Sequence, residues 1–518
     1  MKVLSAIISL ASALTASLVM AEPSAPVNEQ PSFMPRPVKV VLIEHSPGFK
    51  VKNPSDLKLE TRIVPALASV LGKEGYQIKV TPEKITLGAA TPNGIFYAKQ
   101  TLAQAEVKDE KGDLAIPSMT IEDKPRFAWR GLLIDTSRHF FGPPAIKRMI
   151  DLMAIHKLNI LHLHLSDDHG WRVEIKKYPK LTEVGSVRIG TPKCGDKDVQ
   201  DGVPYGGFYT QEDIKELNAY AKEHFITIIP EIEMPGHSAA ALASYPEFGN
   251  KDVPGYKPVV SPWWRVFGYT FSPSEETFTF LDGVIAEVSE MFPDSPYIHI
   301  GGDEAEKAQW DQSPAVQKLM AEKGLKDGHE VQSYFIHRVE KIVNAHGKRL
   351  IGWDEIQEGG LSKTATMMVW RKWESATIAA KQGNDMVIAM YANTYLDHGQ
   401  PCTPAGPAFE NQGNDMPMEK VYNFDPIPDD LKPEQHRQVL GCQGQLWSEL
   451  IPTLGKWEYA AFPRACAIAE VAWSPKEGKN LQDFLKRIAI HEKRLDALKV
   501  NYQKDDGSPA QPDAPMLP

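Results

Sequence analysis

The chain has 518 residues, of which 42% are hydrophobic, 24% charged and 9% aromatic, as is typical of a large soluble globular protein. At roughly 100–200 residues per domain, this length allows several domains, or one large barrel with an accessory domain. Asp and Glu (67) outnumber Lys and Arg (57), and the formal net charge of −10 argues against a nucleic-acid-binding protein. Four cysteines are too few for a disulfide scaffold in a chain of this length.

The first 21 residues have the pattern of a secretory signal peptide. Lys2 provides a positive start, residues 3–19 are uncharged and apolar or small, and Ala21 ends the segment at a site that a signal peptidase would cut. A membrane anchor is the alternative, but serines and threonines interrupt the segment and no basic stop follows it. We predict cleavage after Ala21, which leaves a formal charge of 56 − 67 = −11. We therefore expect an exported, soluble protein, periplasmic or secreted.

Residues 22–124 are predicted to form a small α+β accessory domain. Strands are expected at 38–43 and 116–121, and a hairpin at 76–87, where apolar and polar residues alternate. Helices are expected at 60–71, with Gly72 as the stop, and at 93–105. The segment contains no cluster of reactive side chains, so we expect the functional site elsewhere.

Residues 125–502 are predicted to form a catalytic (β/α)8 TIM barrel, followed by a flexible tail at 503–518. Short apolar runs rich in β-branched residues are expected as strands at 132–135, 159–165, 226–232, 297–300, 349–353, 366–370, 386–390 and 439–446. The clearest amphipathic helices between them are 144–156, 211–224, 276–291 and 331–345. A doubly wound parallel sheet is the alternative, but no Gly-x-Gly-x-x-Gly follows any of these strands.

Polar and aromatic side chains gather where these strands end. The clusters lie at 135–139, 167–169, 231–237, 303–304, 353–355, 370–371, 395–397 and 447–449. One such cluster often only caps the next helix, but eight on one rim favour an active site, because barrel enzymes place their sites at the carboxyl ends of the strands. Carboxylates beside indoles suit sugars, and glycoside hydrolysis needs a carboxylic acid to protonate the leaving oxygen.

Two other chemistries are weaker alternatives. His162 and His164 share one face of a strand and could be metal ligands, yet the chain lacks His-Glu-x-x-His and core histidines give the same pattern. A serine nucleophile has no Gly-x-Ser-x-Gly turn to support it. A carbohydrate-binding protein without activity is a further alternative, which a broken acid pair or a missing tyrosine would favour; neither is seen.

Six segments in order resemble family 20 β-N-acetylhexosaminidases. These segments are 129–139 (WRGLLIDTSRH), 162–168 (HLHLSDD), 230–237 (PEIEMPGH), 299–304 (HIGGDE), 395–397 (YLD) and 445–449 (QLWSE). The resemblance covers nearly the whole chain after the signal, since this family commonly has a small α+β domain before its barrel. It implies an exo-acting, retaining enzyme that hydrolyses terminal β-linked N-acetylglucosamine or N-acetylgalactosamine with no cofactor and no metal.

The resemblance also implies substrate-assisted catalysis, in which the acetamido oxygen of the substrate attacks the anomeric carbon and water opens the resulting oxazolinium. Glu304 would be the general acid and then the base, with its pKa raised. Asp303 would orient the acetamido N–H, and Tyr395 would donate to the acetamido oxygen. Asp167 and His237 resemble a relay that sets the charge and position of Glu304.

The remaining residues implied by the resemblance would bind the sugar. The indoles of Trp353, Trp370 and Trp447 would enclose the acetamido methyl and one ring face. Arg130, Asp397 and Glu449 would hold the hydroxyls of the terminal sugar. The expected partner is a glycan or chitooligosaccharide, with no nucleic acid and no membrane after signal cleavage.

Several features stay open at the level of sequence. The preference for gluco- or galacto-configured sugar, the natural glycan and the oligomeric state cannot be read from it. The stretch 245–272 is either a loop that shapes the site for a longer glycan or a packed connection. Cys402 and Cys442 would come close if their strands are neighbours, so a disulfide between them is a hypothesis.

Overall fold

The computed structural model describes residues 30–46, 48–50, 59–108, 114–193, 196–399, 415–504 and 508–511. The predicted signal peptide and Cys402 lie outside these residues, so the cleavage site and the Cys402–Cys442 disulfide stay predictions. None of the helices in the described part of the chain is long and apolar enough to span a membrane.

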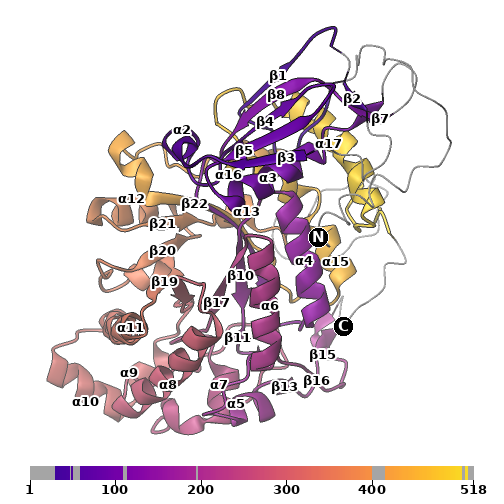
Figure 1. Ribbon diagram of the computed structural model, residues 1–518. Coiled ribbons are helices and arrows are strands. Elements are labelled where there is room, and N and C mark those ends of the chain that lie inside the picture. Colours follow the sequence, from indigo (N-terminus) through magenta and orange to yellow (C-terminus); the bar gives the residue numbers. More distant parts are fainter. Residues whose placement is uncertain are drawn as a thin grey trace.

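The N-terminal part is a five-stranded sheet covered by a helix (Figure 1). The strands run in the order β1 (Lys39–Leu42), β8 (Met119–Asp123), β4 (Tyr76–Val80), β5 (Ile85–Ala89) and β3 (Leu59–Ile63). The predicted hairpin is confirmed, because β4 and β5 pair antiparallel. The predicted second helix is α3 (Pro92–Leu102), whose Thr91 side chain accepts from the Gly94 N–H and caps it. A small second sheet holds β2 (Phe49–Lys50), β7 (Leu114–Ile116) and β6 (Val107–Lys108).

The predicted helix at 60–71 is wrong. Residues 59–63 form β3, which pairs parallel with β5 at the edge of the sheet. Helical structure is limited to η2 (Pro65–Leu67) and α2 (Ala68–Leu71). Proline lacks an N–H and restricts the residue before it to extended conformations, so a helix cannot run through Pro65. Most β3 side chains are exposed, and pairing with β5 rather than local pattern decides this strand.

The C-terminal part is a closed barrel of eight parallel strands, as predicted (Figure 1). In barrel order the strands are β9 (Trp129–Asp135), β10 (Ile160–His164), β17 (Thr227–Glu231), β18 (Tyr297–His299), β19 (Arg349–Trp353), β20 (Thr366–Val369), β21 (Met386–Ile388) and β22 (Val439–Gly444). All eight overlap the predicted strands. These strands could be predicted from the sequence because strands buried on both faces are nearly continuous runs of apolar residues.

Helices connect the strands and pack on the outside of the barrel. The four predicted helices are confirmed as α4 (Pro143–Ile155), α6 (Gln211–Glu223), α8 (Glu275–Met291) and α11 (Gly328–Ala345). The other longer helices are α10 (Pro314–Lys323), α12 (Trp373–Gln382), α15 (Leu454–Ala461), α16 (Arg464–Trp473) and α17 (Leu481–Ala497). Shorter helical segments are α5 (Lys180–Glu183), α7 (Ala239–Ser244), η3 (Pro246–Phe248), α9 (Ala308–Gln312), η4 (Asp354–Gln357), α13 (Tyr391–Thr394), α14 (Met418–Asn423) and η5 (Pro433–Gln438).

Short strand pairs lie in the connections between the barrel elements. They are β11 (Ser166–Asp167) with β12 (Gly170–Trp171), β13 (Val187–Arg188) with β16 (Tyr205–Gly206), and β14 (Pro192–Lys193) with β15 (Asp196–Gln200). In the tail, Gln503 and Pro509 form an isolated antiparallel bridge.

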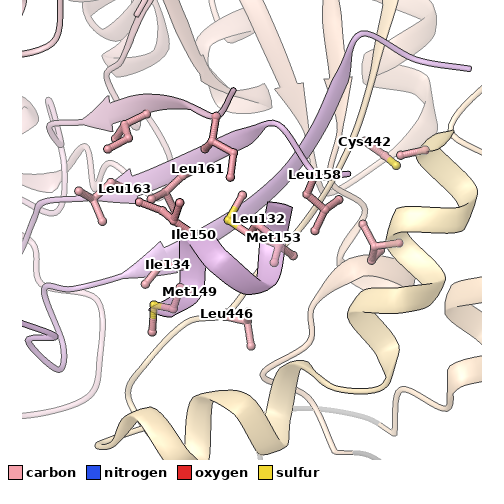
Figure 2. Close-up of a cluster of buried hydrophobic side chains, with 14 of the residues drawn as sticks. Leu132, Ile134, Met149, Ile150, Met153, Leu158, Leu161, Leu163, Cys442 and Leu446 are labelled. Carbon is pink, nitrogen blue, oxygen red and sulfur yellow. The ribbon is translucent and has the colours of Figure 1, made fainter. Parts of the chain in front are cut away.

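Side chains along each barrel strand alternate between two apolar clusters, one between the strands and the outer helices and one inside the barrel. Figure 2 shows side chains of β9 and β10, Leu132 and Leu161 among them, packed with Met149 and Ile150 of α4. The residue between Leu132 and Ile134 on β9, Leu133, belongs to a separate cluster inside the barrel. Successive side chains of a strand point to opposite faces, so His162 and His164 of β10 also lie in the interior.

The accessory sheet packs against the end of the barrel where the strands begin. Lys157, which precedes β10, places its Nζ 3.0 Å from Asp123 Oδ2 at the end of β8. The Trp473 indole of α16 donates to the same carboxylate at 2.9 Å. The opposite rim, where the barrel strands end, is therefore left for the clusters of polar side chains.

Candidate active site

Asp303 and Glu304 lie just beyond the end of β18, where the chain turns sharply. Gly301 and Gly302 adopt φ values of 67° and 94°, and Glu304 itself has φ 46°. A Cβ on Gly301 would stand 1.7 Å from Glu233 Oε2, so only glycine fits there. The turn leaves the Asp303 side chain 13% exposed and the Glu304 side chain 43% exposed, so that one carboxylate is enclosed and the other faces solvent.

His237 connects this acid pair to two further carboxylates. Its Nε2 lies 3.4 Å from Glu304 Oε2 and 3.7 Å from Asp303 Oδ2. Its Nδ1 lies 3.4 Å from Asp167 Oδ1 and 3.3 Å from Asp168 Oδ2. His237 has φ 45°, a left-handed conformation that costs energy in a residue other than glycine and is common at functional sites. The structure thus brings together the predicted residues Asp167, His237, Asp303 and Glu304.

The charges around His237 decide which of these groups holds a proton. Burial disfavours the imidazolium, but the Asp167 charge and the close contacts with Asp167, Asp168 and Glu304 outweigh it and raise the His237 pKa well above its usual value. The hydrogen bond from His237 in turn lowers the pKa of Glu304. The expectation of a raised Glu304 pKa is therefore wrong for the ligand-free protein, because a protonated imidazole stabilises its carboxylate.

Asp303 behaves in the opposite way. Burial, with the charges of Glu231 and Glu304, outweighs the stabilising charge of His237 and raises the Asp303 pKa to about 6. The Oδ1 atom of Asp303 is buried and has no hydrogen-bond partner among the residues that the structure describes. A buried oxygen without a hydrogen bond destabilises the protein unless a ligand supplies the missing donor, so Asp303 is suited to accept a hydrogen bond from a bound molecule.

Four aromatic rings form one wall beside the acid pair. The Trp353 ring centroid lies 6.5 Å from that of Trp370 and 5.7 Å from that of Trp447. Tyr395 stacks on Trp370 at 6.1 Å and lies 6.4 Å from Trp447. The indole N–H groups of Trp353 and Trp370 donate to Glu231 and Glu355, each at 2.9 Å, which fixes the orientation of both rings. The predicted aromatic residues are thus adjacent, and they suit an apolar group such as a methyl.

Asp397, Glu449 and Arg138 form a polar wall. Within the described part of the chain, the buried oxygens Oδ1 of Asp397 and Oε2 of Glu449 have no hydrogen-bond partner. Burial and the nearby charge of Glu449 raise the Asp397 pKa well above its usual value. Arg138 Nη2 lies 2.8 Å from Asp167 Oδ2 and 4.0 Å from Glu449 Oε1. Unsatisfied acceptors beside a guanidinium are suited to binding hydroxyl groups.

Arg130 is a correction, because it does not belong to this wall. It is the second residue of β9, at the opposite end of the barrel, and its side chain is fully buried. Its Nη2 lies 2.8 Å from Glu74 Oε1 in the accessory domain and 3.0 Å from Tyr97 Oη. Arg130 therefore joins the two parts of the chain, whereas Arg138, three residues beyond the end of β9, lies at the rim beside Asp167 and Glu449.

A cleft of about 530 Å³ opens beside Glu304. It is lined by Val266, Glu304, Ala305, Glu306, Lys307, Ala308, Asp311, His329, Glu355, Glu358, Trp370 and Arg371. Val266 belongs to the stretch 245–272, and the Trp264 ring of this stretch lies 5.0 Å from His169. Val266 thus reaches the cleft, whereas Phe248 of the same stretch stacks on Phe280 with ring centroids 4.4 Å apart. That the stretch shapes the site for a longer glycan stays a prediction.

Several groups of described residues have the types of side chain that metals prefer. His162, Glu231 and His299 meet inside the barrel, and His156, Cys466 and His491 meet between helices outside it. In the first group Glu231 is hydrogen-bonded to His164, and in the second a hydrogen bond joins the Nε2 atoms of His156 and His491 at 2.9 Å.

Comparison with known proteins agrees with this geometry. Residues 127–476 match the family model "Glycosyl hydrolase family 20, catalytic domain", and residues 34–124 match "Glycosyl hydrolase family 20, domain 2". The chain belongs to glycosyl hydrolase family 20.

Two bacterial proteins that are similar in sequence to this family 20 chain are both described as beta-hexosaminidases. It is 42% identical to the "Beta-hexosaminidase" of Porphyromonas gingivalis over 83% of this chain and 55% of that protein. It is 31% identical to a "Beta-hexosaminidase" of Akkermansia muciniphila over 94% of this chain and 95% of that protein. The chain thus spans only about half the length of the Porphyromonas relative.

A solved structure is similar over most of the family 20 chain. A "GH20 Exo beta-N-Acetylglucosaminidase" of Vibrio harveyi, in complex with N-acetylglucosamine, has a TM-score of 0.80 and 33% identity. The match covers 95% of this chain and 81% of that chain.

Two functional candidates of this family 20 site escaped the sequence reasoning. Arg138 stands in a polar cluster at a strand end, which was the available signal for preferring it to Arg130. Glu355 also stands in such a cluster, at 353–355, but nothing in the sequence distinguishes it from its neighbour Asp354. Burial and the charges of Asp303 and Asp354 raise the Glu355 pKa to about 9, and only the fold brings Asp303, which is distant in sequence, close to Glu355.

Proposed function

We propose that this protein is an exo-acting, retaining β-N-acetylhexosaminidase that uses the acetamido group of its substrate as the nucleophile. The observation that carries this proposal is the acid pair, with Asp303 enclosed beside the aromatic wall and Glu304 facing the open cleft. A carboxylate beside an apolar pocket can hold an acetamido group, and one at the cleft can reach the leaving oxygen. The descriptions of the relatives support the same activity.

In the first step the acetamido oxygen attacks the anomeric carbon as the glycosidic bond breaks, and a cyclic oxazolinium forms. Asp303, as a carboxylate, accepts the acetamido N–H through its unpartnered Oδ1 and stabilises the positive charge that develops on the ring. The Tyr395 hydroxyl donates to the acetamido oxygen and orients it. Trp353, Trp370 and Trp447 enclose the methyl group and keep water from the nucleophile.

Glu304 and His237 share the proton that the leaving group needs. In the ligand-free site this proton resides on His237. A bound sugar removes water from Glu304, and desolvation favours the neutral forms of both groups, so the proton moves to Glu304. Glu304 then protonates the leaving oxygen. In the second step the Glu304 carboxylate takes a proton from the water that opens the oxazolinium, and the product retains its β configuration.

The terminal sugar is held by the polar wall. Asp397 and Glu449 accept hydrogen bonds from its hydroxyls, and Arg138 donates to them. The preferred substrates in this proposal are glycans or chitooligosaccharides that end in β-linked N-acetylglucosamine or N-acetylgalactosamine.

The proposal is tested with a panel of aryl β-N-acetylglucosaminides, aryl β-N-acetylgalactosaminides and chitobiose. We expect hydrolysis with retention, followed by NMR of the first-formed anomer, and inhibition by a thiazoline analogue of the oxazolinium. Binding of these sugars without turnover would instead identify a carbohydrate-binding protein. Loss of activity in excess chelator would identify a metal-dependent hydrolase. Either result would overturn the proposal.

We also propose that the chain is exported and that its domains divide near residue 125. The sequence pattern of residues 1–21 supports export with cleavage after Ala21. The ends of the two family matches, at 124 and 127, support a boundary between an accessory domain at 22–124 and a barrel at 125–502. N-terminal sequencing of the exported protein tests the cleavage site.

The two arginines offer a matched pair of variants. We expect Arg138→Met to raise KM and lower kcat/KM by roughly 10²-fold or more, because it removes the donor for the sugar and leaves buried carboxylates unpaired. Arg130→Met removes a buried charge of the same kind from the domain junction and should lower the melting temperature without changing KM. Steady-state kinetics and thermal unfolding of both variants check this. An unchanged KM in Arg138→Met would contradict a role of Arg138 at the sugar, and a raised KM in Arg130→Met would contradict the placement of Arg130 at the domain junction alone.

A further inference from the structure

Glu231 is a fully buried carboxylate inside the barrel, at the last position of β17. The strand register aligns it with His164 on one side and with His299 on the other. Because partners in register share one face of a sheet, the three side chains meet in the interior. Burial penalises the Glu231 carboxylate, but the charges of His299, His164 and His162 hold its pKa well below its usual value. Glu231 is therefore an anion in the centre of the molecule.

The two oxygens of Glu231 serve different neighbours. Oε1 accepts the Trp353 indole N–H at 2.9 Å and lies 2.7 Å from His299 Nδ1. Oε2 is hydrogen-bonded to His164 Nδ1 and lies 3.2 Å from His162 Nε2. Oε1 thus fixes the Trp353 ring of the aromatic wall, and Oε2 contacts His164, which lies between Glu231 and Asp167 on the side of the acid pair.

His164 continues the path from Oε2. Its Nε2 lies 3.1 Å from Asp167 Oδ2, so the imidazole stands between two carboxylates. These carboxylates outweigh burial and raise the His164 pKa to about 10, which makes both ring nitrogens donors. Glu233 Oε1 also lies 3.9 Å from His164 Nδ1, but burial and the charges of Asp303 and Glu231 raise the Glu233 pKa well above its usual value. Glu233 is therefore neutral and does not replace Glu231.

We propose that Glu231 is a positioning residue for the general acid, through an unbroken series of side chains of alternating charge that runs Glu231, His164, Asp167, His237, Glu304. This inference rests on the proposed function. Each contact in the series joins an anion to a cation, and the series begins in the barrel core and ends at the cleft. Glu231 keeps His164 charged, His164 and Arg138 orient Asp167, and Asp167 positions His237 beside Glu304 and holds on it the proton that Glu304 receives when the sugar binds. The same carboxylate fixes Trp353, so the acid and the acetamido pocket are held by one buried group.

The variant Glu231→Gln separates these two effects. An amide can keep its oxygen on the Trp353 and His299 side, but its NH2 group cannot accept from His164. The substitution therefore breaks the path to Glu304 and spares the aromatic wall. A damaged acid matters most when the leaving group is poor, so we expect kcat to fall roughly 10–100-fold on chitobiose and far less on a dinitrophenyl β-N-acetylglucosaminide. The ratio of the two rates is independent of how much of the variant is folded.

A double variant and a control complete the experiment. Added to Asp167→Asn, Glu231→Gln should cause little further loss, because residues that act as a unit are not additive. Glu470→Gln is the control, since Glu470 is also buried but pairs with Arg487 outside the barrel interior, and it should lower the melting temperature without changing the substrate ratio.

The outcomes are distinct. An equal fall on both substrates, or losses that multiply in the double variant, would overturn the role of Glu231 while leaving the proposed function intact. A wild-type protein that cleaves neither substrate would overturn the proposed function itself.

Discussion

Glu304→Gln is expected to lower kcat on chitobiose by roughly 10²–10⁴-fold, the usual contribution of a general acid. Glutamine has nearly the same shape and can still accept the hydrogen bond from His237, but it has no proton to give to the leaving oxygen. The first step on a dinitrophenyl glycoside needs no acid, so the loss there should be much smaller. Steady-state rates on the two substrates check this expectation.

Glu306→Gln is the matched control for Glu304→Gln. Glu306 is an exposed carboxylate that lines the same cleft two residues away, so the substitution removes an equal charge from the same surface. We expect wild-type rates on both substrates. If Glu304→Gln turned over chitobiose at the wild-type rate, Glu304 would not be the general acid. If Glu306→Gln lowered the rates as much as Glu304→Gln, the effect would come from the lost negative charge in the cleft rather than from a lost acid.

Asp303→Asn is expected to lower kcat/KM by roughly 10²–10³-fold on every substrate, whatever its leaving group. The amide cannot supply the negative charge that stabilises the oxazolinium, and that charge is needed for good and poor leaving groups alike. We also expect much weaker binding of the thiazoline inhibitor, which Glu304→Gln should bind nearly normally. Asp311→Asn, an exposed carboxylate on the same cleft, is the control and should leave both quantities unchanged.

The pH profile gives an independent test of Asp303. Burial and neighbouring negative charges raise its pKa to about 6, so Asp303 is neutral below this pH and a carboxylate above it. Because the carboxylate is the reactive form, kcat/KM of the wild-type enzyme should fall as the pH drops through about 6. The residual activity of Asp303→Asn should lack this fall. A fall of the same size in the variant would assign the titration to another group.

The strands of the barrel were predictable from the sequence, and the edge strand of the accessory sheet was not. The run Leu161–Leu165 is apolar or histidine on both faces, because it is buried on both faces in the barrel. The residues of β3 are mostly exposed, so apolar and polar residues do not alternate clearly along it. Its extended conformation depends on pairing with β5, in which Leu59 lies opposite Ile85, twenty-six residues later in the chain.

Arg130 and Arg138 show that a residue's place in a sequence motif does not by itself give its place in the fold. Arg130 and Arg138 stand in the same motif, and similarity alone does not tell which one reaches the site. The direction of β9 does, since Arg130 begins the strand beside Glu74 and Arg138 follows its end beside Asp167 and Glu449. The general rule that barrel sites lie at the carboxyl ends of strands was available from the sequence and favours Arg138.

The sequence by itself determined the eight-stranded barrel, the acid pair and the aromatic residues, because periodicity and short motifs are local properties of the chain. Only the tertiary structure decided where the protons reside. The lowered pKa of Glu304 depends on His237, sixty-seven residues earlier, and the charge of His237 depends on Asp167, a further seventy residues earlier. Desolvation and charge act through space over a few ångströms, and these distances exist only once the strands have closed into a barrel.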